Sequence, residues 1–175
     1  MTPLPSAGPV RIVDYDPAWP RMFEEERKRI LGAIGDWLVD IQHVGSTSVP
    51  GLAAKPVVDI MLGLRSLDDG RHIIGRLKEL EYEYNPDDDI PERHYFRRGE
   101  PRLFHLHCVE TTSDFWRRHI AFRNYLREHP EAADEYADLK RRLAADYGND
   151  RIGYTNAKTE FITRIERIAL GEEVA

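Results

Sequence analysis

Apolar and polar residues alternate in several short segments of the first 110 residues, a pattern that indicates β-strands. "LVDIQHV" (38–44) predicts one strand. "VVDIMLGL" (57–64) is nearly continuous in apolar residues, so we expect a central strand that is buried on both faces. "HYFRR" and "RLFHLHCVE" predict two more strands joined by a Gly-Glu-Pro turn. "VRIVDYD" predicts a short strand or extended segment, and "YEYN" a short strand before an acidic loop.

Helical spacing of apolar residues occupies the rest of the chain. Asp16-Pro17 is a typical helix start, and a helix capped by Ser66 extends to about Leu80. After Thr112 the pattern is helical throughout, with starts at Ser113, Pro130 and about Tyr154. This order predicts an α+β fold and a single domain overall. Its parts are a flexible lead (1–9), a mixed core with a small mixed sheet (10–112) and a helical part packed on that core (113–175).

Composition narrows the class of protein. Hydrophobic residues make up 41% of the 175, enough for a core, and no window approaches the roughly 20 apolar residues of a membrane span. The N-terminus lacks the features of a signal peptide, and the single Cys108 suits a reducing compartment, so we expect a cytoplasmic protein. The net charge of −6 argues against a nucleic-acid partner. Arginines are nevertheless concentrated between residues 93 and 102.

Asp59 lies in the middle of the apolar segment 57–64. A carboxylate in a central strand is costly unless it is hydrogen-bonded, ion-paired or bound to a metal. Gly45-Ser46 directly follows the preceding strand, and a Gly there allows backbone amides to approach a ligand closely. The pattern favours a ligand site. The alternative interpretation is a tight turn at Gly45-Ser46 and a structural ion pair of Asp59 with Lys55 or an arginine.

"HVGSTSVPGLAAKPVVDI", with "HLHCVE" and "YTNAKTEFI" further on, resembles the GrpB-like family, a branch of the nucleotidyltransferase (polymerase-beta-like) superfamily. The resemblance implies a sheet of nucleotidyltransferase type flanked by helices. It also implies a Gly-Ser turn that holds phosphates and two strand carboxylates, two residues apart, that hold Mg²⁺. Gly45-Ser46 and Asp59 match this pattern. Met61 occupies the position of the second acid, and its thioether is a poor ligand for a hard cation.

His105 and His107 share one face of their predicted strand, where the superfamily has its third carboxylate. With Asp59 they would form a mixed nitrogen and oxygen site, which favours Mn²⁺, Fe²⁺ or Zn²⁺ over Mg²⁺. The expected cofactor is a divalent metal, with Mg²⁺, Mn²⁺ and Zn²⁺ left open. The three residues are therefore our candidate catalytic and metal-binding residues. Half-buried, hydrogen-bonded histidines are the alternative interpretation.

The leading functional hypothesis is a protein that binds a nucleotide or another phosphorylated small molecule, with metal-dependent nucleotidyl or phosphoryl transfer as its potential activity. The alternatives are a non-catalytic accessory module, since similar domains are fused to dephospho-CoA kinase, and a metal-dependent hydrolase.

Only one of Arg97 and Arg98 can face the site, and we expect the other at the surface. The candidate phosphate-binding residues are Gly45, Ser46, Thr47, Ser48, Lys55, Arg97 and Lys158.

Overall fold

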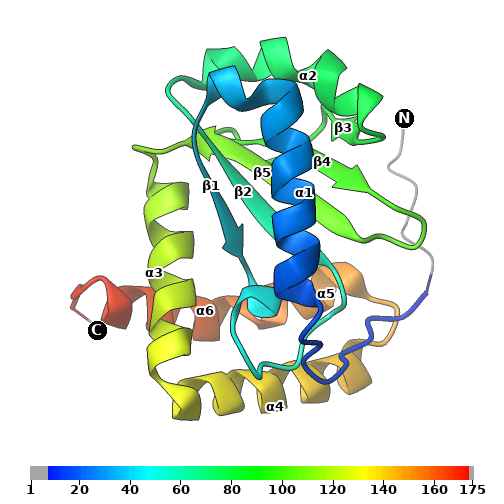
Figure 1. Cartoon of the computed structure of the whole chain (residues 1–175). Coiled ribbons are helices and arrows are strands. Elements are labelled where there is room, and N and C mark those ends of the chain that lie inside the picture. The colour runs from blue at the N-terminus through cyan, green and yellow to red at the C-terminus, as the bar shows by residue number, and fades with distance from the viewer. Residues whose placement is uncertain (1–7, 174–175) are drawn as a thin grey trace.

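A computed structural model describes residues 8–173 and shows a five-stranded mixed sheet (Figure 1). The strand order is β1-β2-β5-β4-β3; β2 and β5 are parallel, and the other neighbours are antiparallel. This sheet with its flanking helices confirms the predicted α+β class. Residues 1–7 of the predicted lead lie outside the described part. The strands are β1 (Leu38–Val44), β2 (Val58–Leu64), β3 (Glu83–Asn85), β4 (His94–Arg98) and β5 (Phe104–Glu110).

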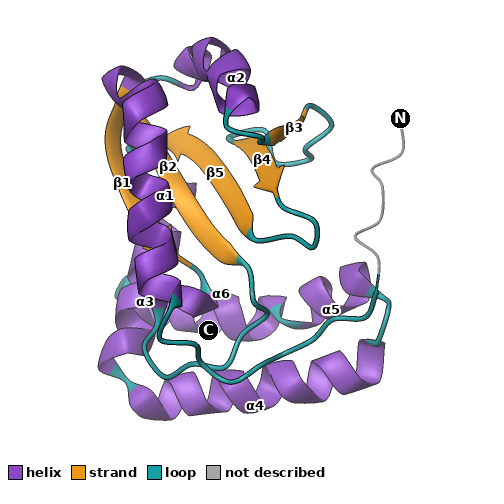
Figure 2. Cartoon of the chain, turned by 45° about the vertical axis from the view of Figure 1, so that its right-hand side comes forward, coloured by secondary structure: helices purple, strands orange, loops and turns teal. Residues whose placement is uncertain are grey.

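Helices cover both faces of the sheet (Figures 1 and 2). On one face, Ile60 and Leu62 of β2 pack in the main core with Ile30 and Ile73, which lie on α1 and α2. On the other face α3 packs over part of the sheet, while α4, α5 and α6 lie across the end of the sheet where β1 finishes. The helices are α1 (Trp19–Ile34), α2 (Gly70–Glu79), α3 (Asp114–Glu128), α4 (Pro130–Tyr147), α5 (Arg151–Ala157) and α6 (Thr159–Ala169).

Several predicted boundaries were wrong for local reasons. The Asp16 side chain accepts a hydrogen bond from the Ala18 amide, so the chain first makes a turn and α1 begins only at Trp19. Ser66 caps a short 3₁₀ turn (Leu67–Asp69), and α2 follows it. The single helix predicted after Tyr154 is two helices, α5 and α6, that meet at Lys158. The segment 10–16, predicted as a short strand or extended segment, forms an isolated β-bridge between Val13 and Ala54.

Arg98 is not the surface residue that we predicted. Its side chain is 20% exposed and lies 3.2 Å from Oε2 of Glu26, which is 3% exposed as a residue. Oε1 of Glu26 also accepts a 2.7 Å hydrogen bond from the Tyr82 hydroxyl, and Arg29 pairs with the same carboxylate. A buried carboxylate thus joins α1 to β4 and to the segment before β3. None of the helices in the described residues is long and apolar enough to cross a membrane.

Candidate functional site

Three predicted site residues meet on the sheet face opposite α1. Asp59 pairs with His105 in the parallel β2–β5 ladder, and His107 is two positions further along β5, on the same face. Oδ1 of Asp59 lies 3.0 Å from Nε2 of His107 and 3.4 Å from Nδ1 of His105. Both imidazoles therefore face one carboxylate oxygen.

The protonation of this trio follows from its surroundings. Burial on its own raises the pKa of Asp59, but the hydrogen bonds and positive potential of His105 and His107 hold it well below the usual range. Burial lowers the pKa of His105, although Asp59 opposes that shift. At neutral pH the site therefore holds a carboxylate anion beside a neutral His105 imidazole.

Position 45 must be a glycine because of its backbone conformation and its close contact with Asp59. Its φ of 71° and ψ of −176° belong to a region that only glycine occupies readily. A Cβ atom added at position 45 would lie 2.8 Å from Oδ2 and 3.3 Å from Cβ of Asp59. The turn and the carboxylate are thus packed directly against each other.

The hydroxyl groups after Gly45 are engaged within the protein. Ser46 Oγ accepts a hydrogen bond from Nζ of Lys140, Thr47 Oγ1 lies 2.9 Å from His43 Nε2, and Ser48 Oγ donates to the Gly45 carbonyl. Lys140 on α4 is 2% exposed, and burial lowers its pKa to about 7. All three hydroxyl groups thus have partners within the protein, and the role of the turn in phosphate binding stays a prediction.

Thr47 and His43 belong to the α1 side of the sheet. The His43 ring stacks on Phe23 of α1 with 4.9 Å between ring centres, and burial lowers its pKa to about 4. Together with Ser48, His43 lines an open hollow that also contains Arg123 and Arg127. His43 and Ser48 thus border a different hollow from the one that His105 lines.

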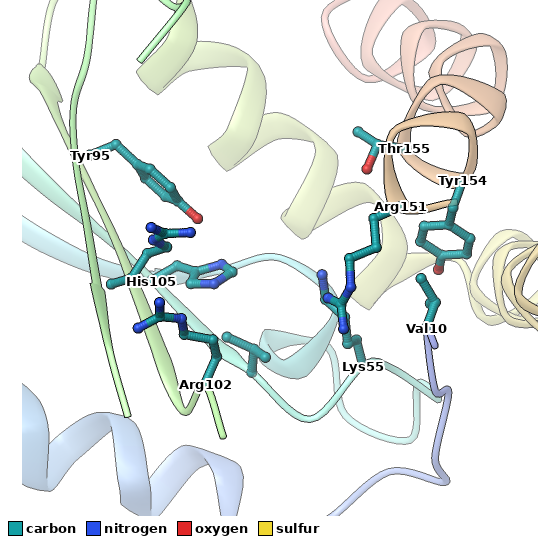
Figure 3. A pocket seen from close by; sticks show the side chains of 10 residues that line it. Val10, Lys55, Tyr95, Arg102, His105, Arg151, Tyr154 and Thr155 are labelled. Carbon is teal, nitrogen blue, oxygen red and sulfur yellow. The ribbon is translucent and has the colours of Figure 1, made fainter. Parts of the chain in front are cut away.

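A cationic cavity opens beside His105, between the sheet and α5 (Figure 3). Its volume is about 180 Å³. Four of the lining residues are cationic, and none of those in the described chain is acidic. Figure 3 shows the His105 ring projecting from the sheet toward Lys55 and Arg151. The lining consists of Val10, Lys55, Val57, Tyr95, Arg97, Arg102, His105, Arg151, Tyr154 and Thr155.

The predicted Lys55 and Arg97 both line this cavity, whereas Lys158 is not part of the lining and contacts it through Tyr154. Burial lowers the pKa of Lys55, against the attraction of Asp59. Nε of Arg97 is buried and has no hydrogen-bond partner within residues 8–173. Nζ of Lys158 stands 4.5 Å from the ring centre of Tyr154, and burial lowers its pKa to about 8. Arg102 pairs with Glu83 at 3.1 Å, whereas Lys55, Arg97 and Arg151 form no ion pair within the described residues, so the cavity keeps an excess of positive charge.

Met61 is fully buried, at 0% exposure. It packs with Val44 and Val109 against Phe115 and Trp116 of α3. In this fold the position of the second superfamily carboxylate is part of an apolar cluster under a helix. It cannot contribute a ligand to the site.

Sequence reasoning missed several residues near the trio. Nη1 of Arg93 lies 3.0 Å from Nδ1 of His107, and Tyr95 has its ring 5.5 Å from His105. His119 on α3 is 6.3 Å from His107, and burial lowers its pKa to about 4. The arginine-rich stretch 93–102 was the available sequence signal for Arg93. No sequence signal indicated that α3 would bring His119 close to His107.

The trio does not fit a divalent metal in its present arrangement. A metal would need a lone pair on the ring nitrogen of each histidine that binds it. The Arg93 N–H groups can only donate, so Nδ1 of His107 accepts, and Nε2 carries the hydrogen that it donates to Asp59. No group of three or more His, Cys, Asp or Glu side chains between residues 8 and 173 is arranged around a metal position.

The fold and the site define a mixed α+β protein in which a Gly-Ser turn packs against a strand carboxylate beside a cationic cavity. The chain belongs to the GrpB family, since the family model described as "GrpB protein" matches residues 9–167. The crystal structure of the conserved protein GrpB from Enterococcus faecalis is similar, with a TM-score of 0.85 and 35% identity; the match covers 92% of this chain and 98% of that one.

Relatives of known sequence differ in length. Glutamate-rich protein GrpB of Alkalihalophilus pseudofirmus is 37% identical over 90% of this chain and 94% of its own length. UPF0157 protein YqkA of Bacillus subtilis is 36% identical over 91% of this chain, which spans only 47% of that relative. A dephospho-CoA kinase of Mycolicibacterium paratuberculosis is 28% identical over 86% of this chain and 44% of its own length.

Proposed function

We propose that this protein binds a nucleotide or another phosphorylated small molecule through the cationic cavity beside His105. The observation that carries the proposal is the set of four cations, Lys55, Arg97, Arg102 and Arg151, around one cavity of a protein whose net charge is −6. Guanidinium groups bind phosphate oxygens with paired N–H donors, and a lysine adds a compact charge.

The size of the cavity supports a phosphate group as the part that is held. Pockets that enclose a drug-sized ligand measure roughly 300–1,000 Å³, whereas this cavity measures about 180 Å³. A phosphate or diphosphate group fits in such a space, and the remainder of the ligand would extend beyond the rim. Val10, Val57 and Tyr154 offer apolar surface at the same cavity.

The buried position of Met61 bears on the reaction. Two-metal nucleotidyl transfer needs two carboxylates on adjacent same-face positions of one strand, and here only Asp59 is available. This favours ligand binding without two-metal chemistry and keeps the non-catalytic accessory module as the second candidate. The likeness to a dephospho-CoA kinase makes coenzyme A precursors suitable members of a ligand panel.

The experiment is a thermal-shift panel of nucleotides, coenzyme A precursors and inorganic phosphate, with and without Mg²⁺, Mn²⁺ or Zn²⁺. A ligand at a hundredfold excess over its dissociation constant stabilises the fold by about 2.7 kcal/mol. At about 2–4 °C per kcal/mol, this corresponds to a shift of roughly 5–10 °C in Tm.

Matched variants locate the ligand. Arg97→Met and Lys55→Met should reduce the shift. Arg71→Met should leave it intact, because Arg71 is exposed on α2, which covers the other face of the sheet. Equal shifts in all three variants would place the ligand outside the cavity and overturn the proposal.

A further inference from the structure

A line of hydrogen bonds connects the acidic loop before β4 to the site. Arg93 donates to both carboxylate oxygens of Asp88, at 2.7 Å from Nε and 2.6 Å from Nη2. The two side chains are only 12% and 7% exposed. Nη1 of Arg93 then reaches Nδ1 of His107, whose Nε2 reaches Asp59. Each contact in this line pairs a donor with an acceptor.

The donor direction along the line is fixed by Arg93. A guanidinium group has five N–H donors and no acceptor, so the ring atom facing it must supply a lone pair. Nδ1 of His107 is that atom, and the ring hydrogen therefore resides on Nε2 and points at Asp59. The Arg93 side chain is itself held by Asp88 and lies over the Tyr95 ring, 4.4 Å from its centre. His107 thus serves as a hydrogen-bond donor to Asp59.

His105 is left with the opposite arrangement. Its Nδ1 faces the same carboxylate oxygen at 3.4 Å, so the ring hydrogen belongs on Nδ1. Nε2 then carries the free lone pair. Since the ring itself lines the cationic cavity (Figure 3), this lone pair is available to a ligand there. An imidazole oriented by a carboxylate on one nitrogen is the usual arrangement of a general base.

We propose that His105 is a metal-independent proton acceptor for a hydroxyl group at the cationic cavity, and that Arg93 is the positioning residue that keeps His107 and Asp59 in place behind it. In the step itself, the hydroxyl O–H bond breaks, the proton bonds to Nε2 of His105, and the electron pair stays on the oxygen. The cations of the cavity stabilise the resulting oxyanion. The binding of a ligand at the cavity rests on the proposed function. The arrangement of the two histidines does not depend on it.

The first test is ¹⁵N NMR of protein labelled in histidine, without any ligand. We expect His107 to show a protonated Nε2 and an unprotonated Nδ1, and His105 to show the reverse. Added Zn²⁺ should leave both sets of ring resonances unmoved. A His107 ring protonated on Nδ1, or Zn²⁺ binding by both histidines, would overturn the proposal.

Variants at Arg93 test its positioning role. Arg93→Met keeps the apolar stem over Tyr95 but removes the donors, and Asp88→Asn is combined with it so that no unpaired carboxylate is buried. In the double variant Nδ1 of His107 loses its hydrogen-bond donor, so its ¹⁵N resonance should shift, while Asp59 continues to favour the hydrogen on Nε2. Arg93→Lys, which retains a donor, should restore the original resonance at least in part. An unchanged His107 resonance in the folded double variant would show that Arg93 has no such role.

The second test uses inorganic phosphate as the probe. Phosphate should move the Nε2 resonance of His105 and leave the tautomer of His107 as it was. Phosphate-dependent shifts at Lys55 and Arg97 without a response from His105 would overturn the proton-acceptor role. If phosphate moves no resonance at all, both the proton-acceptor role and the binding of phosphate at the cavity are overturned. The tautomers measured without ligand then show whether the arrangement of the histidines was correct.

Discussion

The Cα atom of Gly45 faces the Asp59 carboxylate so closely that a side chain at position 45 would stand 2.8 Å from Oδ2. The turn after β1 and the strand β2 are therefore fitted to each other at this point. Only a residue without a Cβ atom satisfies both the contact and the backbone angle.

Gly45→Ala should lower the free energy of unfolding more than the backbone strain of about 1–3 kcal/mol accounts for, because the new methyl group also displaces Asp59. Gly51→Ala is the control, since Gly51 has a φ of 81° but nothing within 4 Å of its added Cβ. Urea denaturation of both variants measures the difference. Equal losses would show that the contact with Asp59 costs nothing.

Met61→Asp should not recreate a second metal ligand. The new carboxylate would be buried in the apolar cluster under α3, and we expect a loss of more than about 3 kcal/mol or failure to fold. Met61→Leu, with a similar volume, should cost less than about 1.5 kcal/mol. Chemical denaturation measures both. A stable Met61→Asp variant that binds Mg²⁺ would contradict our account of this position.

Glu26→Ala should be strongly destabilising. The change leaves Arg98, whose side chain is 20% exposed, without its carboxylate and removes the acceptor of the Tyr82 hydroxyl. Breaking a buried pair in this way costs about 3–5 kcal/mol. The neighbouring Glu25 forms an exposed pair with Arg21, so Glu25→Ala should change stability by less than about 1 kcal/mol. Similar urea midpoints for the two variants would refute the structural role of Glu26.

Stability should fall with acid between pH 6.5 and about 4, in part because of His43. Burial lowers the pKa of His43 from 6.5 to about 4, so in this range the unfolded chain binds a proton that the folded protein does not. The unfolding free energy therefore decreases as the pH falls, by about 3 kcal/mol for this residue at 1.36 kcal/mol per pH unit. His43→Gln should flatten the profile measured by denaturation at stepped pH. An equally steep profile in the variant would assign the acid sensitivity to other groups.

The sequence was sufficient to predict which strand residues face the site, but not the side chains that contact those residues from other elements. Alternation along β2 and β5 places Asp59, His105 and His107 on one face, because strand geometry is local. The apolar segment 57–64 predicted burial on both faces, but the packing of α3 over Met61 is a tertiary contact. The hydrogen bond of Arg93 to His107 depends on a loop conformation, which no nearby periodic pattern encodes. Local rules therefore found the residues that face the site and missed the one that orients them.

Lys140 reaches Ser46 across 94 residues of chain, and this separation sets an order of events during protein synthesis. At about 5–20 residues per second, the ribosome makes α4 roughly 5 to 20 s after the Gly-Ser turn has been translated. Until then the turn lacks the amine that accompanies it in the folded protein, and the growing chain exposes the apolar residues around Val49 and Leu52 that later pack against α4 and α6. The site is thus completed by the last third of the chain, and a nascent chain that stalls before α4 would present this apolar surface to chaperones.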